Sequence, residues 1–144
     1  MKLAFLLWLA TIAPQPAADQ ICLATTVYLE ARSESTRGQM AVAEVAMRRR
    51  DSGRWGTTVC DVVRAPGQFA LTVGSPERIL RNPVAWQKAW HVAGQTLDMW
   101  AKPRDQRQFV VPHADSFATV DIAPYWTKGP PLATIGSHSF YRVN

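Results

Sequence analysis

The sequence predicts a single α+β domain that is helical in its N-terminal half and ends in a small C-terminal β-sheet. The 144 residues fit one domain, and an apolar fraction of 47% is enough for one core. Apolar residues recur at helical spacing through residue 100. Short apolar runs that suit strands follow after residue 107. Helices first and strands last are typical of α+β domains.

The first 18 residues are expected to be a secretory signal. Met1-Lys2 supplies a positive start, residues 3–13 are apolar, and residues 14–18 are small or polar. The apolar run is shorter than the roughly 20 residues that span a bilayer, so no stable membrane span is expected after cleavage. We place cleavage after Ala18, which leaves residues 19–144 as the mature domain. An uncleaved anchor and a buried N-terminal helix are the alternatives.

The first two helices of the mature domain follow from spacing and capping patterns. Apolar spacing predicts a helix over residues 20–32. Thr36 and Gln39 fit a capping box, so the second helix is expected to begin at Thr36 and to run to Arg50. Arg49 falls on its apolar face. The positive charges at residues 48–50 suit the C-terminal end of the helix dipole, which is our interpretation of them.

The rest of the chain divides into a loop, a third helix and two strands. Residues 53–82 are expected to be irregular because of their turn residues. Asn82-Pro83 then predicts a helix start, and this helix should end before Pro103. Residues 108–111 and 139–143 are predicted to be short strands.

The two cysteines and the net charge suit an exported protein. In an oxidising compartment Cys22 and Cys60 are expected to pair, although two buried thiols remain the alternative. The net charge of +5 suits an anionic polymer such as the cell wall. Basic residues are scattered apart from 48–50, so a nucleic-acid partner is not expected. His91, His113 and His138 lack the spacing of a metal site, and no cofactor is expected.

Glutamates are few, and one stands in an apolar setting. Glu44 and Glu77 are expected to be solvated surface residues. Glu30 lies among apolar and aromatic residues, and a partly desolvated carboxyl can stay protonated as a general acid must. A cap or a salt bridge is the alternative role for Glu30. Glu34, four residues later, either shares acid and base work with Glu30 or pairs with a neighbouring arginine in the turn.

The motifs of this chain resemble those of SleB-type cell wall hydrolases, a family that includes spore-cortex-lytic enzymes and phage-borne relatives. The resemblance rests on these blocks, which occur in order over nearly the whole mature chain: Cys22-Leu23-Ala24, Tyr28-Leu29-Glu30-Ala31-Arg32, Gly38 to Val45, Thr58 to Val63, Pro66-Gly67-Gln68-Phe69, Pro124-Tyr125-Trp126, Ile135-Gly136 and His138-Ser139-Phe140-Tyr141. Each block alone is weak, but the ordered set is specific.

The resemblance implies a lysozyme-like catalytic domain that acts on the glycan strands of peptidoglycan. It implies cleavage of the β-1,4 bond between N-acetylmuramic acid and N-acetylglucosamine, with Glu30 as acid and then base. The 6-hydroxyl of the muramic acid would close an anhydro ring, as in lytic transglycosylases. Such an enzyme is expected to be a monomer in the periplasm or outside the cell. A water-using muramidase of the phage endolysin kind and an inactive wall-binding relative are the alternatives.

Further residues receive expected roles in substrate binding. Gln68 can hydrogen-bond an N-acetyl group or the developing oxyanion, with a polar turn residue as the alternative. His138 can bond a sugar hydroxyl, with a packed or surface histidine as the alternative. Aromatic platforms for sugar faces are expected among Tyr28, Phe69, Tyr125, Trp126 and Tyr141, with core packing as the alternative for each.

The chain departs from the family pattern in three places. The pair Arg48-Arg49 stands where the family commonly has Asn-Arg, and Ala70 replaces a serine. Residues 114–118 replace a histidine- and aromatic-rich block. Asp115 in this block is the candidate second carboxylate for a hydrolytic variant.

Overall fold

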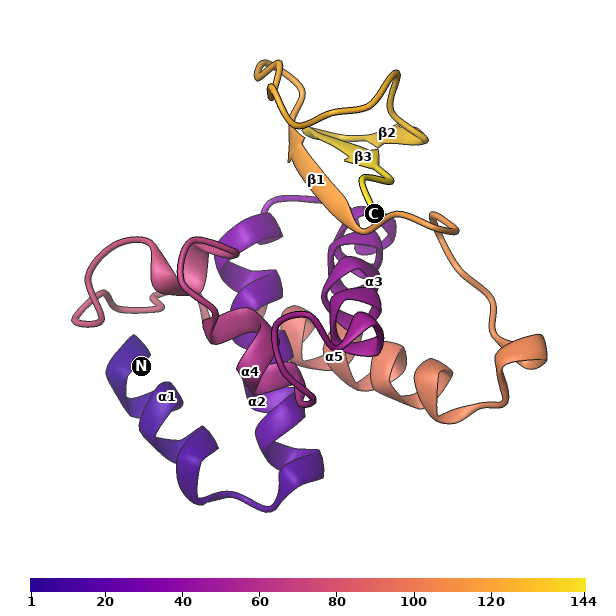
Figure 1. Ribbon diagram of the computed structural model, residues 1–144. Coiled ribbons are helices and arrows are strands. Elements are labelled where there is room, and N and C mark those ends of the chain that lie inside the picture. The colour runs from indigo at the N-terminus through magenta and orange to yellow at the C-terminus, as the bar shows by residue number, and fades with distance from the viewer.

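The computed structural model describes residues 1–144 and places a helical part below a small sheet (Figure 1). The helical elements are α1 (Leu3–Ile12), α2 (Gln15–Ala31), α3 (Thr36–Ser52), α4 (Val59–Arg64) and α5 (Pro83–Ala101), with short 3₁₀ turns η1 (Ala70–Thr72) and η2 (Arg104–Gln106). The strands are β1 (Ser116–Thr119), β2 (Ala133–Ile135) and β3 (His138–Tyr141). This arrangement confirms the predicted α+β class.

The core forms around α2, because this helix packs against α1, α3, α4 and α5. Every residue from Ile21 to Tyr28 is buried. Such all-round burial explains why α2 is apolar on several faces instead of one. Glu30, the last but one residue of α2, is partly buried and lies at the edge of this core.

Local capping decides where the two long central helices begin. Asn82 accepts a hydrogen bond from Ala85 N at 3.0 Å, which confirms the predicted start of α5. The predicted capping box at Thr36 is wrong, because Ser35 is the N-cap and accepts from Gly38 N. The side chain of Gln39 instead donates to Ala31 O at 3.0 Å, and so joins α3 to the end of α2.

The segment that was expected to be irregular contains the short helix α4. Its start is a capping box in which Thr58 accepts from Asp61 N and the Asp61 carboxylate accepts from Thr58 N. The spacing of these two residues was the available signal. Six residues are too few to show a helical apolar period, which is why periodicity missed this element.

The sheet is antiparallel, with strand order β1-β3-β2. Ser116 pairs with Tyr141 in β1 and β3, and Ala133 pairs with Phe140 in β2 and β3. The predicted final strand is confirmed near its expected place, whereas β1 and β2 were not predicted.

The predicted strand at residues 108–111 is wrong, and Glu44 explains why. The Glu44 carboxylate accepts from Val110 N at 2.7 Å and from Val111 N at 3.0 Å, so these amides are not free to pair with a strand. Glu44 is 3% exposed and forms an ion pair with Arg48 at 3.4 Å. The expectation that Glu44 is a solvated surface residue is therefore also wrong, while Glu77 is exposed as expected.

The N-terminal residues form helix α1, which packs along α2 on the side away from the sheet (Figure 1). Leu3, Leu6 and Ala10 are buried. Helix α2 begins at Gln15, so the expected cleavage point after Ala18 lies within its first turn. None of the helices is both long and apolar enough to cross a membrane.

A disulfide between Cys22 and Cys60 links α2 to α4, as the sequence predicted. It closes a loop between residues 38 positions apart. The segment after α4 contains Ala70, whose backbone N–H contacts Glu30. The disulfide therefore fixes the position of α4, the helix that precedes the segment in contact with Glu30.

Replacing both cysteines, Cys22→Ser with Cys60→Ser, is expected to lower the free energy of unfolding by about 3–4 kcal/mol, because the unfolded chain regains the entropy of an open loop. Urea unfolding of the double variant measures the loss. Wild-type protein in a reductant is the matched control and should approach the variant. An unchanged midpoint with an unchanged slope would contradict this prediction.

Candidate active site

The Glu30 carboxyl lines a pocket of about 370 Å³ between α2, the end of α3 and the segment around η1. The other lining residues are Arg49, Gly67, Gln68, Phe69, Ala70, Val73 and Phe117. Ala70 N donates to Glu30 Oε1 at 2.5 Å, and this contact holds one carboxyl oxygen against the wall of the pocket. Glu30 is the pocket's only acidic residue.

Burial raises the pKa of Glu30 above the usual value of 4.5, because desolvation disfavours the charged form. The hydrogen bond from Ala70 N and the positive charges of His138 and Arg49 oppose this shift but do not cancel it. A half-buried carboxyl with a raised pKa can hold its proton closer to neutrality than a solvated one. This is the property that a general acid needs.

Arg49, near the C-terminal end of α3, connects the Glu30 pocket to the segment that precedes β1. Its guanidinium donates to Gln68 Oε1 at 3.3 Å and to Asp115 O at 2.9 Å, and lies 4.7 Å from the ring centre of Phe69. Burial lowers the pKa of Arg49, while Asp115 and Glu30 raise it. Because Arg49 occupies the amide oxygen of Gln68, the Gln68 NH₂ group is left to donate to a ligand.

Three aromatic rings connect the pocket to the sheet. Phe69, 3% exposed, packs against Phe117 with ring centres 6.2 Å apart. Phe117 in turn meets the edge of His138 at 5.3 Å. His138 is buried and does not line the pocket, so its contact with Phe117 lies outside the pocket.

Glu34 is held by the turn between β2 and β3. Its Oε1 atom accepts from Ser137 N at 2.7 Å and lies 3.5 Å from His138 Nδ1. This partner set differs from the neighbouring arginines considered from the sequence. Glu34 does not line the Glu30 pocket. His138 therefore lies beside Glu34, and its charge also acts on Glu30.

The turn beside Glu34 requires glycine at position 136. Gly136 has a positive φ of 56°, and a Cβ atom there would lie 2.5 Å from Glu34 Oε1. We expect Gly136→Ala to lower the free energy of unfolding by about 1–3 kcal/mol, since it strains the backbone and displaces the carboxylate. Urea denaturation checks this, with Gly129→Ala as the control for backbone strain alone, because Gly129 also has positive φ but has open space around it. Equal losses in the two variants would contradict a role for the Glu34 contact.

The other aromatic residues singled out from the sequence lie outside the Glu30 pocket. Tyr28 is 1% exposed, and its hydroxyl accepts from Asn82 N, so it takes the core-packing role. Tyr125 is 98% exposed in the loop before β2. Trp126, in the same loop, contacts Tyr141 of β3 edge to face, with ring centres 5.5 Å apart. The structure thus brings Glu30, Gln68 and Phe69 together and leaves these four apart.

Arg49 lines the pocket although, like Phe117, it was not anticipated there. Its interpretation as a dipole-stabilising charge is incomplete, because its partners lie on two other segments. The available signal was a charged residue on the apolar face of a helix. Asp115, the other candidate carboxylate, accepts from Val143 N at 2.8 Å and from Asn144 N at 2.9 Å, outside the Glu30 pocket. No group of three or more His, Cys, Asp and Glu side chains is placed to hold a metal ion.

Comparison with known proteins gives one match. The profile of the cell wall hydrolase family matches residues 33–141, which is more than half of the chain. The match begins three residues after Glu30 and includes Arg49, Gln68, Phe69 and Phe117. No curated protein and no solved structure matches the chain.

Proposed function

The chain belongs to the cell wall hydrolase family, whose substrate is peptidoglycan, and we propose that it is a lytic transglycosylase with Glu30 as its acid and base. The bond cut is the β-1,4 link between N-acetylmuramic acid and N-acetylglucosamine. The observation that carries this proposal is a single raised-pKa carboxyl in a pocket that has no second acid.

The reaction needs two proton transfers at Glu30. The protonated carboxyl donates to the glycosidic oxygen while the bond from that oxygen to the anomeric carbon breaks. The carboxylate then takes the proton of the muramic acid 6-hydroxyl, whose oxygen attacks the anomeric carbon and closes the anhydro ring. Glu30 ends protonated, and no water is consumed.

The placement of the other acids supports this reaction over a water-using one. A hydrolase of the inverting or retaining kind uses a second carboxylate across the cut bond. Glu34 is engaged by Ser137 N, and the Asp115 carboxylate is engaged by Val143 N and Asn144 N. Neither lines the Glu30 pocket. A nucleophile that belongs to the substrate removes the need for a second protein carboxylate.

Binding roles follow from the same contacts. Gln68, with its amide oxygen held by Arg49, donates from its NH₂ group to an acetamido oxygen of the sugar. Phe69 and Phe117 give an apolar wall for a sugar face. Tyr125, Trp126 and Tyr141 do not line this pocket, and we assign them to glycan beyond it.

We also propose that the protein is exported. Residues 1–18 act as the secretory signal, and residues 19–144 form the catalytic domain in the periplasm or outside the cell. The disulfide fits an oxidising compartment. N-terminal sequencing of the exported protein, with Asp19 as the expected first residue, tests this part.

The test of the reaction is mass spectrometry of soluble fragments released from purified peptidoglycan. Anhydro ends, lighter by one water than hydrated ends, are the expected product. Hydrated reducing ends would replace the proposed reaction with hydrolysis, and Glu34→Gln and Asp115→Asn would then identify the second carboxylate. Absence of any fragment from peptidoglycan of several wall types would overturn the proposed activity.

A further inference from the structure

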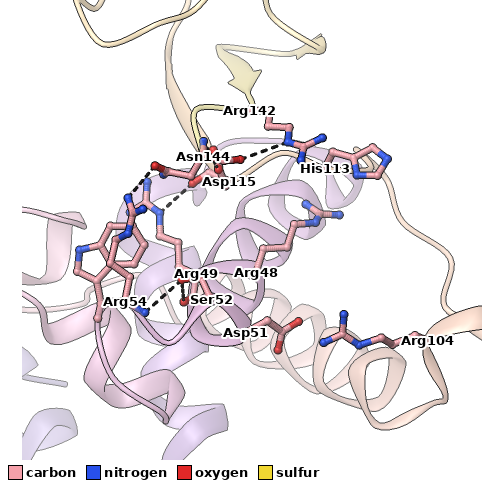
Figure 2. Close-up of a pocket in the computed structure, with 11 residues that line it drawn as sticks. Arg48, Arg49, Asp51, Ser52, Arg54, Arg104, His113, Asp115, Arg142 and Asn144 are labelled. Atoms are coloured by element: carbon pink, nitrogen blue, oxygen red, sulfur yellow. Dashed lines mark hydrogen bonds between the residues drawn. The ribbon is translucent and has the colours of Figure 1, made fainter.

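A second pocket, here called the arginine pocket, adjoins the Glu30 pocket. It has a volume of about 340 Å³, and the two share Arg49 in their linings. Figure 2 shows side chains from the end of α3, from η2 and from the C-terminal segment converging on it. Its five arginines are Arg48, Arg49, Arg54, Arg104 and Arg142.

The arginine pocket carries a surplus of positive charge. Five arginine side chains face two aspartate side chains, Asp51 and Asp115, so the side-chain charge surplus is three when His113 is neutral. Both aspartates already have other partners: Asp51 accepts from Trp100 Nε1, and Asp115 accepts from two backbone amides. Their remaining capacity to neutralise the arginines is therefore small.

Four of the five guanidinium groups, all except that of Arg48, form no ion pair with an acidic side chain. Arg54 donates to the side-chain amide oxygen of Asn144, which is a neutral acceptor, and Arg142 donates to Asn144 O (Figure 2). Arg104 makes no side-chain hydrogen bond or ion pair, and its side chain is exposed on η2. These groups retain donors for an anionic ligand.

The backbone of His113 is a second, independent sign of a binding site. His113 lines the arginine pocket and is the one non-glycine residue with positive φ, at 71°. A left-handed conformation costs energy for residues other than glycine, and such residues cluster at functional sites. Figure 2 places the His113 ring at the rim of the pocket, beside Arg142.

The basic surface continues past the arginine pocket. A neighbouring pocket of about 300 Å³ shares Arg48, Asp51, Arg104 and His113 with it and adds Arg107. An extended tripeptide is about 10 Å long, so a ligand of this length could lie across the two adjoining pockets. The cationic lining therefore suits a short chain with several negative groups better than a single ion.

We propose that the arginine pocket binds the carboxylates of the peptide stem attached to the glycan strand. This inference rests on the proposed function, because it takes the strand in the Glu30 pocket as given. The stem hangs from the muramic acid that Glu30 would act on, so a site for it must adjoin the Glu30 pocket. The shared residue Arg49 meets this requirement. Planar guanidinium groups bind carboxylates through paired hydrogen bonds, which gives the pocket its specificity.

The direct test is calorimetric titration of the full-chain Glu30→Gln protein with the free stem tripeptide alanyl-γ-glutamyl-diaminopimelate. Adding Arg104→Gln and Arg142→Gln is expected to weaken binding by about tenfold or more, since each removes a charged donor. Arg81→Gln is the matched control, because Arg81 is exposed, has no ion pair and lines neither pocket. A tripeptide with amidated carboxylates should lose binding to the parent protein.

Two results would overturn the proposal. One is tripeptide affinity that is the same in the double arginine variant. The other is no tripeptide binding while inorganic polyphosphate binds, which would assign the pocket to phosphate polymers instead. Because this titration needs no turnover, it separates the pocket from the reaction. If wild-type protein cleaves no wall but binds the tripeptide through these arginines, the proposed reaction is wrong and the proposed stem site stands.

The rate of glycan cleavage gives a second test of the stem site. Wild-type kcat/KM is expected to be higher on complete strands than on strands whose stems have been removed. Arg104→Gln with Arg142→Gln should reduce this difference while leaving the rate on stripped strands unchanged. An equal loss on both substrates would contradict a stem site, since it would indicate a general effect on fold or on glycan binding.

Discussion

Glu30→Gln is expected to lower the rate of wall cleavage by about 10²–10⁴-fold, because it removes the group that both donates and accepts the proton. The substitution keeps the shape of the side chain and an oxygen that can accept from Ala70 N, so the pocket should remain assembled. Release of fragments from purified peptidoglycan, followed over time at equal protein concentration, measures the loss.

The same variant is expected to gain stability at neutral pH. Burial raises the pKa of Glu30, so the folded protein holds this proton more tightly than the unfolded chain does. Ionised Glu30 therefore costs stability above its unfolded pKa, and the cost is complete only above the higher folded pKa. Glu30→Gln has no such cost. Its advantage over wild type should disappear as the pH falls below about 4.

Glu77→Gln is the matched control for both measurements, because Glu77 is exposed in a loop and does not line the Glu30 pocket. It should cleave and unfold like wild type. Wall cleavage by Glu30→Gln at the wild-type rate would remove Glu30 from the mechanism. Loss of cleavage together with loss of stability would indicate a structural role for the carboxyl instead of a chemical one.

The sequence predicted those parts of the fold whose causes are local. The start of α5 follows from an N-cap residue and a proline that are adjacent in the chain, and the apolar spacing of α2 and α3 follows from their burial. The sheet was harder, because β1 has four residues and pairs only with β3, whose residues lie about twenty positions further on. Periodicity within a window carries no information about such pairing.

The residues of the candidate site also divide into those whose role follows from neighbouring residues in the sequence and those whose partners are distant. Glu30 stood out because its neighbours in the sequence are apolar, and Gln68 and Phe69 because of a short motif. Arg49 and Phe117 did not stand out, since the partners that give them a place in the pocket come from other segments. Glu44 was assigned to the surface for the same reason: its two amide partners lie 66 and 67 positions away.

Glu44→Ala is expected to lower the free energy of unfolding by about 3–5 kcal/mol, because it leaves the partly buried Arg48 without its carboxylate and two backbone amides without an acceptor. Urea unfolding measures the loss. Glu77→Ala is the control and should fall within about 0.5 kcal/mol of wild type. Glu44→Gln, which keeps an acceptor but not the charge, should lie between Glu44→Ala and wild type.

The consequence of losing Glu44 should extend to the active site. Residues 110–111, which Glu44 holds, lead directly to Ala114 and Asp115, whose carbonyl groups accept from Arg48 and Arg49. Those contacts fix the start of β1 and with it Phe117 in the wall of the Glu30 pocket. Glu44→Ala should therefore also cleave more slowly at temperatures where it is fully folded. If it unfolds early but cleaves at the wild-type rate when folded, then Phe117 is held by the sheet alone, and the link from Glu44 through Arg49 to the pocket is wrong.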